Sequence, residues 1–173
     1  AEAFPESGAR VVIPSRKQDA WEEVAAEINA KVGAGRALAV AASISEKEAL
    51  RHLVDRTREE FGPVDILVCN AATNPYYGPM AGISDEQFRK IFDNNVLSNH
   101  WLISMVAPEM AARGAGSIIV VSSVGGLIAS DTIGAYNISK AADFQLVRNL
   151  ALELGRQNIR VNAIAPGGVK TPI

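Results

Sequence analysis

The chain contains 173 residues, 48% of them hydrophobic, and carries a formal net charge of −2. This length and apolar content predict one globular domain, residues 1–173, and exclude an intrinsically disordered segment. The small charge gives no basis for attraction to nucleic acid or an anionic membrane. No apolar run reaches the ~18 to 20 residues of a membrane span. No signal-peptide pattern opens the chain, so we expect a cytoplasmic protein.

Residue types that build metal or redox centres are scarce. The single cysteine, Cys69, cannot form an internal disulfide, and its place at the end of an apolar run predicts a small core residue. The two histidines, His52 and His100, stand far apart, with no cysteine or carboxylate at ligand spacing. We therefore expect no metal site.

Apolar runs and helical periodicities alternate along the chain. We expect strands at 10–13, 37–42, 64–69, 117–121 and 160–165, and helices within 21–32, 45–61, 84–113 and 136–154. Capping boxes are expected at Ser45 with Glu48 and at Ser84 with Gln87, because each serine precedes a helix and is followed three residues later by a glutamate or glutamine. The alternation predicts an α/β fold of parallel βαβ units, with helices on both faces of the sheet.

The stretch from Ser122 to Lys140 contains the strongest chemical signal. It begins where the strand 117–121 ends, at the edge where open α/β sheets bind ligands. Tyr136 and Lys140 are one helical turn apart, so their side chains share a face. A cation beside a phenol favours the ionised form, which suits general acid/base catalysis. Such a pair alone is also typical of a solvated helix face, so the interpretation depends on the other motifs.

Five motifs stand in a distinctive order. They are Asn70-Ala71-Ala72 after a strand, Asn94-Asn95-Val96 within a helix, Ser123, Tyr136-x-x-x-Lys140, and Asn162-x-Ile164-x-Pro166-Gly167 with Thr171 four residues on. In this order and spacing the chain resembles the short-chain dehydrogenase/reductase family over essentially its whole length. The run 70–75 is similar to that of the tetrameric NADP-dependent carbonyl reductases of the classical branch. The resemblance implies a Rossmann-type, doubly wound parallel sheet.

The resemblance also implies a catalytic set of Asn95, Ser123, Tyr136 and Lys140. Ser123 orients the substrate carbonyl, and Tyr136 protonates its oxygen. Lys140 perturbs the phenol and binds the nicotinamide ribose. Asn95 interrupts its helix and holds a water that links Lys140 to solvent; the alternative is a polar residue on a helix surface.

Cofactor contacts are expected from both halves of the chain. They are Ser15, Arg16, Lys17, Ser43, Ile44, Asn70, Ala71, Ala72, Tyr136, Lys140, Pro166, Gly167, Val169 and Thr171. The turn Ser15-Arg16-Lys17 favours NADP, because no carboxylate precedes Asp19 and Arg16 suits a 2′-phosphate. NAD is the alternative cofactor, and a solvated helix start is the alternative role for Arg16 and Lys17. Residues 70–72 also suit an ordinary turn.

Several features of the family pattern are not in this sequence. The Gly-rich turn that binds a pyrophosphate is missing, together with the first strand. The chain ends at Ile173, before the segment that closes over the substrate and the last strand of the sheet. Ser43-Ile44 stands where many relatives have Asp-Val. We interpret the sequence as a dinucleotide-binding and catalytic domain that is incomplete at both ends.

These features favour an NADP(H)-dependent oxidoreductase acting on a small-molecule ketone, aldehyde or secondary alcohol. The alternatives are an NAD-dependent alcohol dehydrogenase or 3-oxoacyl reductase, an epimerase or dehydratase of the extended branch, and a non-catalytic, truncated scaffold. The apolar residues of helices 95–110 and 141–154 exceed one inward stripe, which predicts a homo-oligomer, a dimer or tetramer. Their burial within one chain is the alternative. The apolar residues concerned are Trp101, Leu102, Met105, Phe144, Leu146, Val147 and Leu150.

Overall fold

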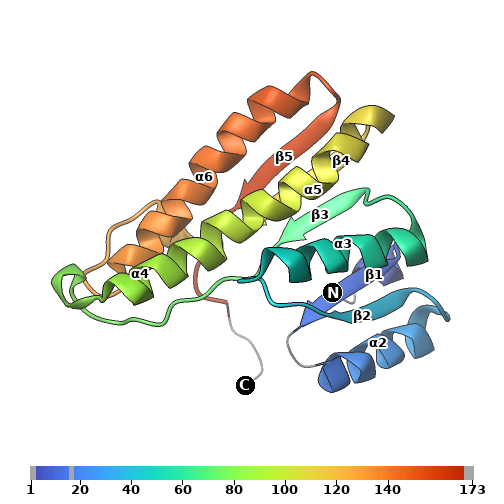
Figure 1. The fold of residues 1–173 in the computed structure, drawn as a ribbon, viewed down its shortest axis with the longest axis horizontal. Coiled ribbons are helices and arrows are strands. Elements are labelled where there is room, and N and C mark those ends of the chain that lie inside the picture. The colour runs from blue at the N-terminus through green and yellow to red at the C-terminus, as the bar shows by residue number, and fades with distance from the viewer. Residues whose placement is uncertain (1–2, 16–17, 170–173) are drawn as a thin grey trace. The chain divides into compact units, whose positions relative to one another are not determined.

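The computed structural model describes residues 3–15 and 18–169. The chain forms two compact units, residues 1–63 and 64–173. Each unit combines parallel strands with helices, which confirms the predicted α/β class (Figure 1). The expectation that both units belong to one domain stays a prediction. In the part of the chain described, no helix is both long and apolar enough to span a bilayer.

The first unit is a two-stranded sheet with its helices. It contains α1 (Ala3–Glu6), β1 (Val11–Ser15), α2 (Gln18–Val32), β2 (Ala37–Ala41) and α3 (Lys47–Phe61). β1 and β2 pair in parallel, with Val11 opposite Ala37 and Ser15 opposite Ala41. Its core packs Ile28 of α2 against Ile13 and Ala39 of the strands. The small and β-branched residues of these strands suit burial beneath a helix.

One of the two expected capping boxes is wrong. α3 begins at Lys47, with Glu46 at the N-cap position and no side-chain cap. Ser45 lies one residue too early, and its hydroxyl lies 2.8 Å from that of Ser43. Glu48 instead pairs with Arg51, at 3.2 Å. A serine hydroxyl with a nearby partner of its own does not have to cap the helix.

The second unit is a three-stranded parallel sheet with helices packed against it. Its elements are β3 (Ile66–Cys69), η1 (Met80–Gly82), α4 (Asp85–Phe92), the π-helix η2 (Asp93–Leu97), α5 (Ser98–Arg113), β4 (Gly116–Val121), η3 (Val124–Gly126), α6 (Gly134–Gly155) and β5 (Ile159–Ile164). The strand order is β3-β4-β5. α6 packs on β5, and α5 packs on β3 and β4. Figure 1 shows α4 and α5 as one long rod beside α6.

Burial of the central strand, β4, agrees with its position between two other strands. Ile118 and Val120 of β4 are fully buried, as are Ile103 and Met110 of α5. A parallel strand covered on both sides is expected to be an almost continuous apolar run. β4 pairs in parallel with β3 on one side and with β5 on the other. The carboxyl ends of all three strands therefore lie at one edge of the sheet.

The second capping box is confirmed and provides a test of the fold. The Ser84 hydroxyl accepts a hydrogen bond from the Gln87 amide at 3.2 Å, and the Gln87 side chain accepts one from the Ser84 amide at 3.1 Å. We expect Ser84→Ala to lower the free energy of unfolding by about 1 kcal/mol, because it leaves a helix N–H without its cap. Urea denaturation would measure this change.

The matched control is Ser104→Ala, at an exposed position inside α5. Alanine has the higher helix propensity, so this variant should keep or slightly raise stability. Equal stability of Ser84→Ala and the parent would contradict the capping role.

Candidate active site

Two strand ends of the second unit are tied together beside the predicted Ser123. The Ser122 amide donates to the Ile164 carbonyl at 2.8 Å, and the Val124 amide donates to the Pro166 carbonyl at 2.9 Å. The residues that follow β4 and β5 therefore lie side by side. This is the sheet edge at which open α/β folds place ligands.

The turn after β4 is anchored to α6. Ser122 is buried, and its hydroxyl donates to the Lys140 carbonyl at 2.7 Å. A Cβ added to Gly126 would lie 2.7 Å from the Lys140 backbone, so only glycine permits this close approach. The half-buried Ser123 caps η3, and its hydroxyl accepts from the Gly125 amide at 3.0 Å. The strand end and the Tyr136 helix are thereby held together.

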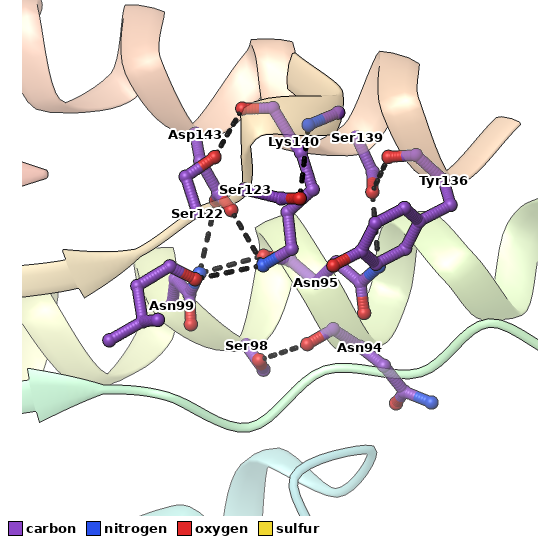
Figure 2. A network of polar contacts seen from close by, with 12 residues as sticks. Asn94, Asn95, Ser98, Asn99, Ser122, Ser123, Tyr136, Ser139, Lys140 and Asp143 are labelled. Carbon is purple, nitrogen blue, oxygen red and sulfur yellow. Dashed lines mark hydrogen bonds and ion pairs between the residues drawn. The ribbon is translucent and has the colours of Figure 1, made fainter. Parts of the chain in front are cut away.

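Tyr136 and Lys140 lie on one face of α6, as their spacing predicts. The Lys140 Nζ lies 5.8 Å from the centroid of the Tyr136 ring. Figure 2 shows the Tyr136 hydroxyl directed to the side on which Lys140 lies. Tyr136 is half-buried, whereas the Lys140 side chain is only 2% exposed. A phenol that solvent reaches beside a buried cation has the components of an acid/base pair.

Asn95 lies in the π-turn η2, which is the interruption expected of its helix. It is fully buried, so the alternative of a helix-surface residue is wrong. Its Oδ1 accepts from the Thr73 amide at 2.8 Å, and its Nδ2 donates to the Thr73 carbonyl and the Ser139 hydroxyl, both at 3.0 Å. The Ser139 hydroxyl donates to the Tyr136 carbonyl at 2.7 Å. Asn95 thus connects the loop after β3 to the helix turn that bears Tyr136.

The structure adds two residues that sequence reasoning missed, Asp143 and Asn99. Asp143 is fully buried, and its Oδ2 lies 3.2 Å from the Lys140 Nζ. Asn99 donates from Nδ2 to the other carboxylate oxygen at 3.1 Å and to the Asn95 carbonyl at 2.7 Å. Figure 2 shows this network between α5 and α6. An aspartate three residues after Lys140, one turn along the same helix, was the available signal.

Burial is the main cause of two raised pKa values at this network, those of Asp143 and Cys69. Burial raises the pKa of Asp143 above its ordinary value, against the opposing effects of Lys140 and Asn99. At the end of β3, burial and then Asp143 raise the pKa of the Cys69 thiol to about 12. The thiol is therefore neutral at physiological pH, in agreement with the predicted core role of Cys69.

The other predicted contacts divide between the two units. In the second unit, Asn70, Ala71, Ala72, Gly167 and Val169 are exposed and Pro166 is half-buried at the strand ends, which leaves their backbone open to a ligand. In the first unit, Ser15 ends β1, and the half-buried Ser43 and Ile44 follow β2. Arg16, Lys17 and Thr171 lie outside the described residues. Within the described ranges, no three His, Cys, Asp or Glu residues cluster as a metal site.

Solved structures of other proteins have the same fold. L-sorbose reductase from Gluconobacter frateurii, solved with NADPH and L-sorbose, aligns with a TM-score of 0.93 and 34% identity, over 99% of this chain and 64% of that one. A 7α-hydroxysteroid dehydrogenase complexed with NADH and 7-oxo glycochenodeoxycholic acid aligns with a TM-score of 0.89 and 37% identity, over 96% of this chain and 64% of that one.

Sequence comparison identifies relatives that are longer than this chain. Dehydrogenase/reductase SDR family member 4 of Rattus norvegicus is 38% identical over 172 residues, and the Caenorhabditis elegans protein of that name is 36% identical over 171. The chain is covered to 99% in both cases, but it spans only 61% and 65% of the two relatives. The family model described as short chain dehydrogenase matches residues 1–173. The motifs, the fold and these matches agree, and the chain belongs to the short-chain dehydrogenase family.

Proposed function

We propose that this chain forms the main part of an oxidoreductase that transfers a hydride between NADP(H) and a carbonyl or secondary alcohol. The observation that supports this most directly is the convergence of Ser123, Tyr136 and Lys140 beside one edge of the sheet. The Ser122 hydroxyl, at the end of β4, donates to the Lys140 carbonyl and so ties this strand end to α6. A hydroxyl, a phenol and an ammonium group are the set that carbonyl reduction needs.

Each side chain has a distinct task in the proposed reaction. The Ser123 hydroxyl donates a hydrogen bond to the substrate carbonyl oxygen and orients it. Tyr136 gives its phenolic proton to that oxygen during reduction and takes a proton from the alcohol in the reverse direction. Lys140 places positive charge beside the phenol, which favours the phenolate left after proton transfer. Asn95 holds the helix turn that carries Tyr136.

The exposed strand ends fit the nicotinamide end of the cofactor. Ala71, Ala72 and Gly167 are small and exposed, so a flat ring can approach their backbone. Lys140 uses two of its three N–H donors on Val121 and Asp143, and the third is the donor that would bind a ribose hydroxyl. When bound, the nicotinamide supplies the hydride, whereas the protein supplies orientation and the proton.

The names of two structural neighbours support this class of reaction. One is a reductase of L-sorbose solved with NADPH, and the other is a dehydrogenase of a hydroxysteroid solved with NADH. Both names describe interconversion of an alcohol and a carbonyl. Because one contains NADPH and the other NADH, they leave the choice of cofactor to the Ser15-Arg16-Lys17 turn.

One prediction of the proposed function concerns the proton donor. We expect Tyr136→Phe to lower kcat by roughly 10²- to 10⁴-fold with NADPH and the best carbonyl substrate, because it removes one hydroxyl and the proton that it transfers. The assay uses the natural full-length protein with a panel of dicarbonyls, quinones and 3-oxoacyl esters. Tyr77→Phe is the matched control, since Tyr77 is 76% exposed. Turnover by Tyr136→Phe within a few-fold of the parent would exclude the proposed role.

A second prediction concerns the cofactor. Charged hydrogen bonds contribute roughly 1.5 to 3 kcal/mol, so an Arg16 bond to the 2′-phosphate predicts a preference for NADPH over NADH of roughly 10- to 150-fold. Arg16→Asp should reverse the preference by replacing attraction with repulsion. The measurement is kcat/KM for both cofactors. Arg51→Asp, which makes the same charge change on α3, should leave the ratio unchanged; an unchanged ratio in Arg16→Asp would show that this turn does not select the cofactor.

We also propose a homo-oligomer built on α5 and α6. Trp101, Leu102 and Met105 of α5 are only partly buried, as are Phe144, Leu146 and Leu150 of α6. Val147 is buried and belongs to the core of one chain, which corrects its inclusion in the expected interface. Light scattering at micromolar concentration should give the mass of a dimer or tetramer, and Leu150→Glu should reduce that mass because it buries a charge. A monomeric parent would refute the proposal.

A further inference from the structure

We propose that Asp143, oriented by Asn99, is a positioning residue that holds the Lys140 ammonium group at the active site. The inference extends the proposed function, in which Lys140 acts beside Tyr136. Asp143 itself contacts neither Tyr136 nor the exposed sheet edge through any hydrogen bond in the described structure; its carboxylate bonds Lys140 and Asn99. Its influence on the reaction therefore passes through Lys140.

The Lys140 ammonium group has two hydrogen-bond acceptors in the structure. The Val121 carbonyl, at the end of β4, lies 3.0 Å away, and Asp143 Oδ2 lies 3.2 Å away. Both side chains of the ion pair are buried, with 2% and 0% of their surface exposed. A flexible lysine has four rotatable bonds, so two acceptors in different directions restrict the position of its Nζ. Only one of these acceptors neutralises its charge.

Asn99 restricts the carboxylate in turn. Its Nδ2 donates both to Asp143 Oδ1 and to the Asn95 carbonyl, so the amide joins the π-turn η2 to α6. Each oxygen of Asp143 therefore has its own donor, one from Asn99 and one from Lys140. A buried ion pair with all of these bonds satisfied is rigid, whereas a partly satisfied one is costly.

Burial limits what the ionised pair contributes to the free energy of folding. The pKa of Asp143 is raised mainly by burial, although Lys140 and Asn99 act to lower it. A carboxyl whose pKa is higher in the folded state than in the unfolded state favours folding below the unfolded value and loses that contribution as the pH rises through the folded value. The ionised carboxylate therefore costs stability at neutral pH. Two apolar residues of similar volume would often be as stable.

The proposal is tested first by the reactivity of Lys140, which does not depend on turnover. Acetic anhydride labels accessible amines, and mass spectrometry of the digested, natural full-length protein measures labelling at Lys140. In Asp143→Asn we expect labelling at least about 10-fold faster, because the amine loses its charged partner and its fixed position. Asp85→Asn is the control, since it removes the same charge from an exposed ion pair with Arg89. The exposed Lys90 provides an internal reference in every variant.

The second readout is the dependence of kcat on pH. Asp143→Asn should lower kcat by about 10- to 100-fold at neutral pH, as expected of a displaced catalytic group. In the parent, kcat should fall as the pH drops through the raised pKa of Asp143, because the protonated carboxyl no longer pairs with Lys140. The variant should lack this acidic limb. The other titratable neighbours of Asp143 are Lys140 and the thiol of Cys69, which stays neutral through this range.

The outcomes separate this proposal from the proposed function. Unchanged labelling of Lys140 in a folded Asp143→Asn would overturn the positioning role whether or not the parent is active. Faster labelling with an unchanged kcat and pH profile in an active parent would also overturn it, while the proposed function would stand. An inactive parent would refute the proposed function, and the labelling would still decide whether Asp143 holds Lys140.

A folding defect is controlled with two further variants. Circular dichroism and thermal unfolding identify an Asp143→Asn protein that has lost its structure. In that case Asn99→Ala, which keeps both charges and removes one donor, should speed Lys140 labelling in the same direction by a smaller factor. Labelling of folded Asn99→Ala at the parent's rate would then overturn the proposal. The double variant Lys140→Met with Asp143→Leu should fold, because it removes both charges together.

Discussion

An ammonium group withdrawn from water organises the second unit. Lys140 is almost completely buried, and a buried charge persists only where a counter-ion and hydrogen-bond acceptors compensate its loss of hydration. The Val121 carbonyl and the Asp143 carboxylate meet this need. The carboxylate then requires a second donor, which Asn99 provides from α5. A single buried charge thus requires a backbone carbonyl at the end of β4 and polar side chains on α5 and α6.

The position of that charge depends on the parallel sheet. β4 pairs with β3 on one side and with β5 on the other, and its apolar residues are buried. This pairing and burial hold the end of the strand in a defined position. Ser122 and Gly126 attach α6 to this end, one through a hydrogen bond and the other through the absence of a side chain. Tyr136 and Lys140 are therefore held by a regular element, α6, and such elements position side chains more accurately than loops do.

The π-turn at η2 couples the same edge to a third element. A π-turn inside a helix is rare and sacrifices regular backbone bonding. Here the buried Asn95 side chain makes three hydrogen bonds, two with Thr73 and one with Ser139, that offset this cost. The Asn95 carbonyl accepts from Asn99, so the turn is also joined to the network around Lys140. Changes in the loop after β3 can thereby affect the turn of α6 that carries Tyr136.

The features that the sequence by itself determined are those that depend on neighbouring residues alone. Periodicity was sufficient for the α/β order, and the spacing of Tyr136 and Lys140 placed them on one helix face, because residues four apart meet in any helix. The Ser84 capping box depends on equally local contacts. The same pattern at Ser45 forms no capping box, and the Ser45 hydroxyl pairs with that of Ser43 instead. Only the tertiary structure decided the partners of Asp143. An aspartate three residues after a lysine is usually a solvated pair, but here packing removes the water and brings Asn99, 44 residues away in sequence, to the second carboxylate oxygen. This burial depends on residues that are distant in the sequence, so a short stretch of sequence cannot predict it.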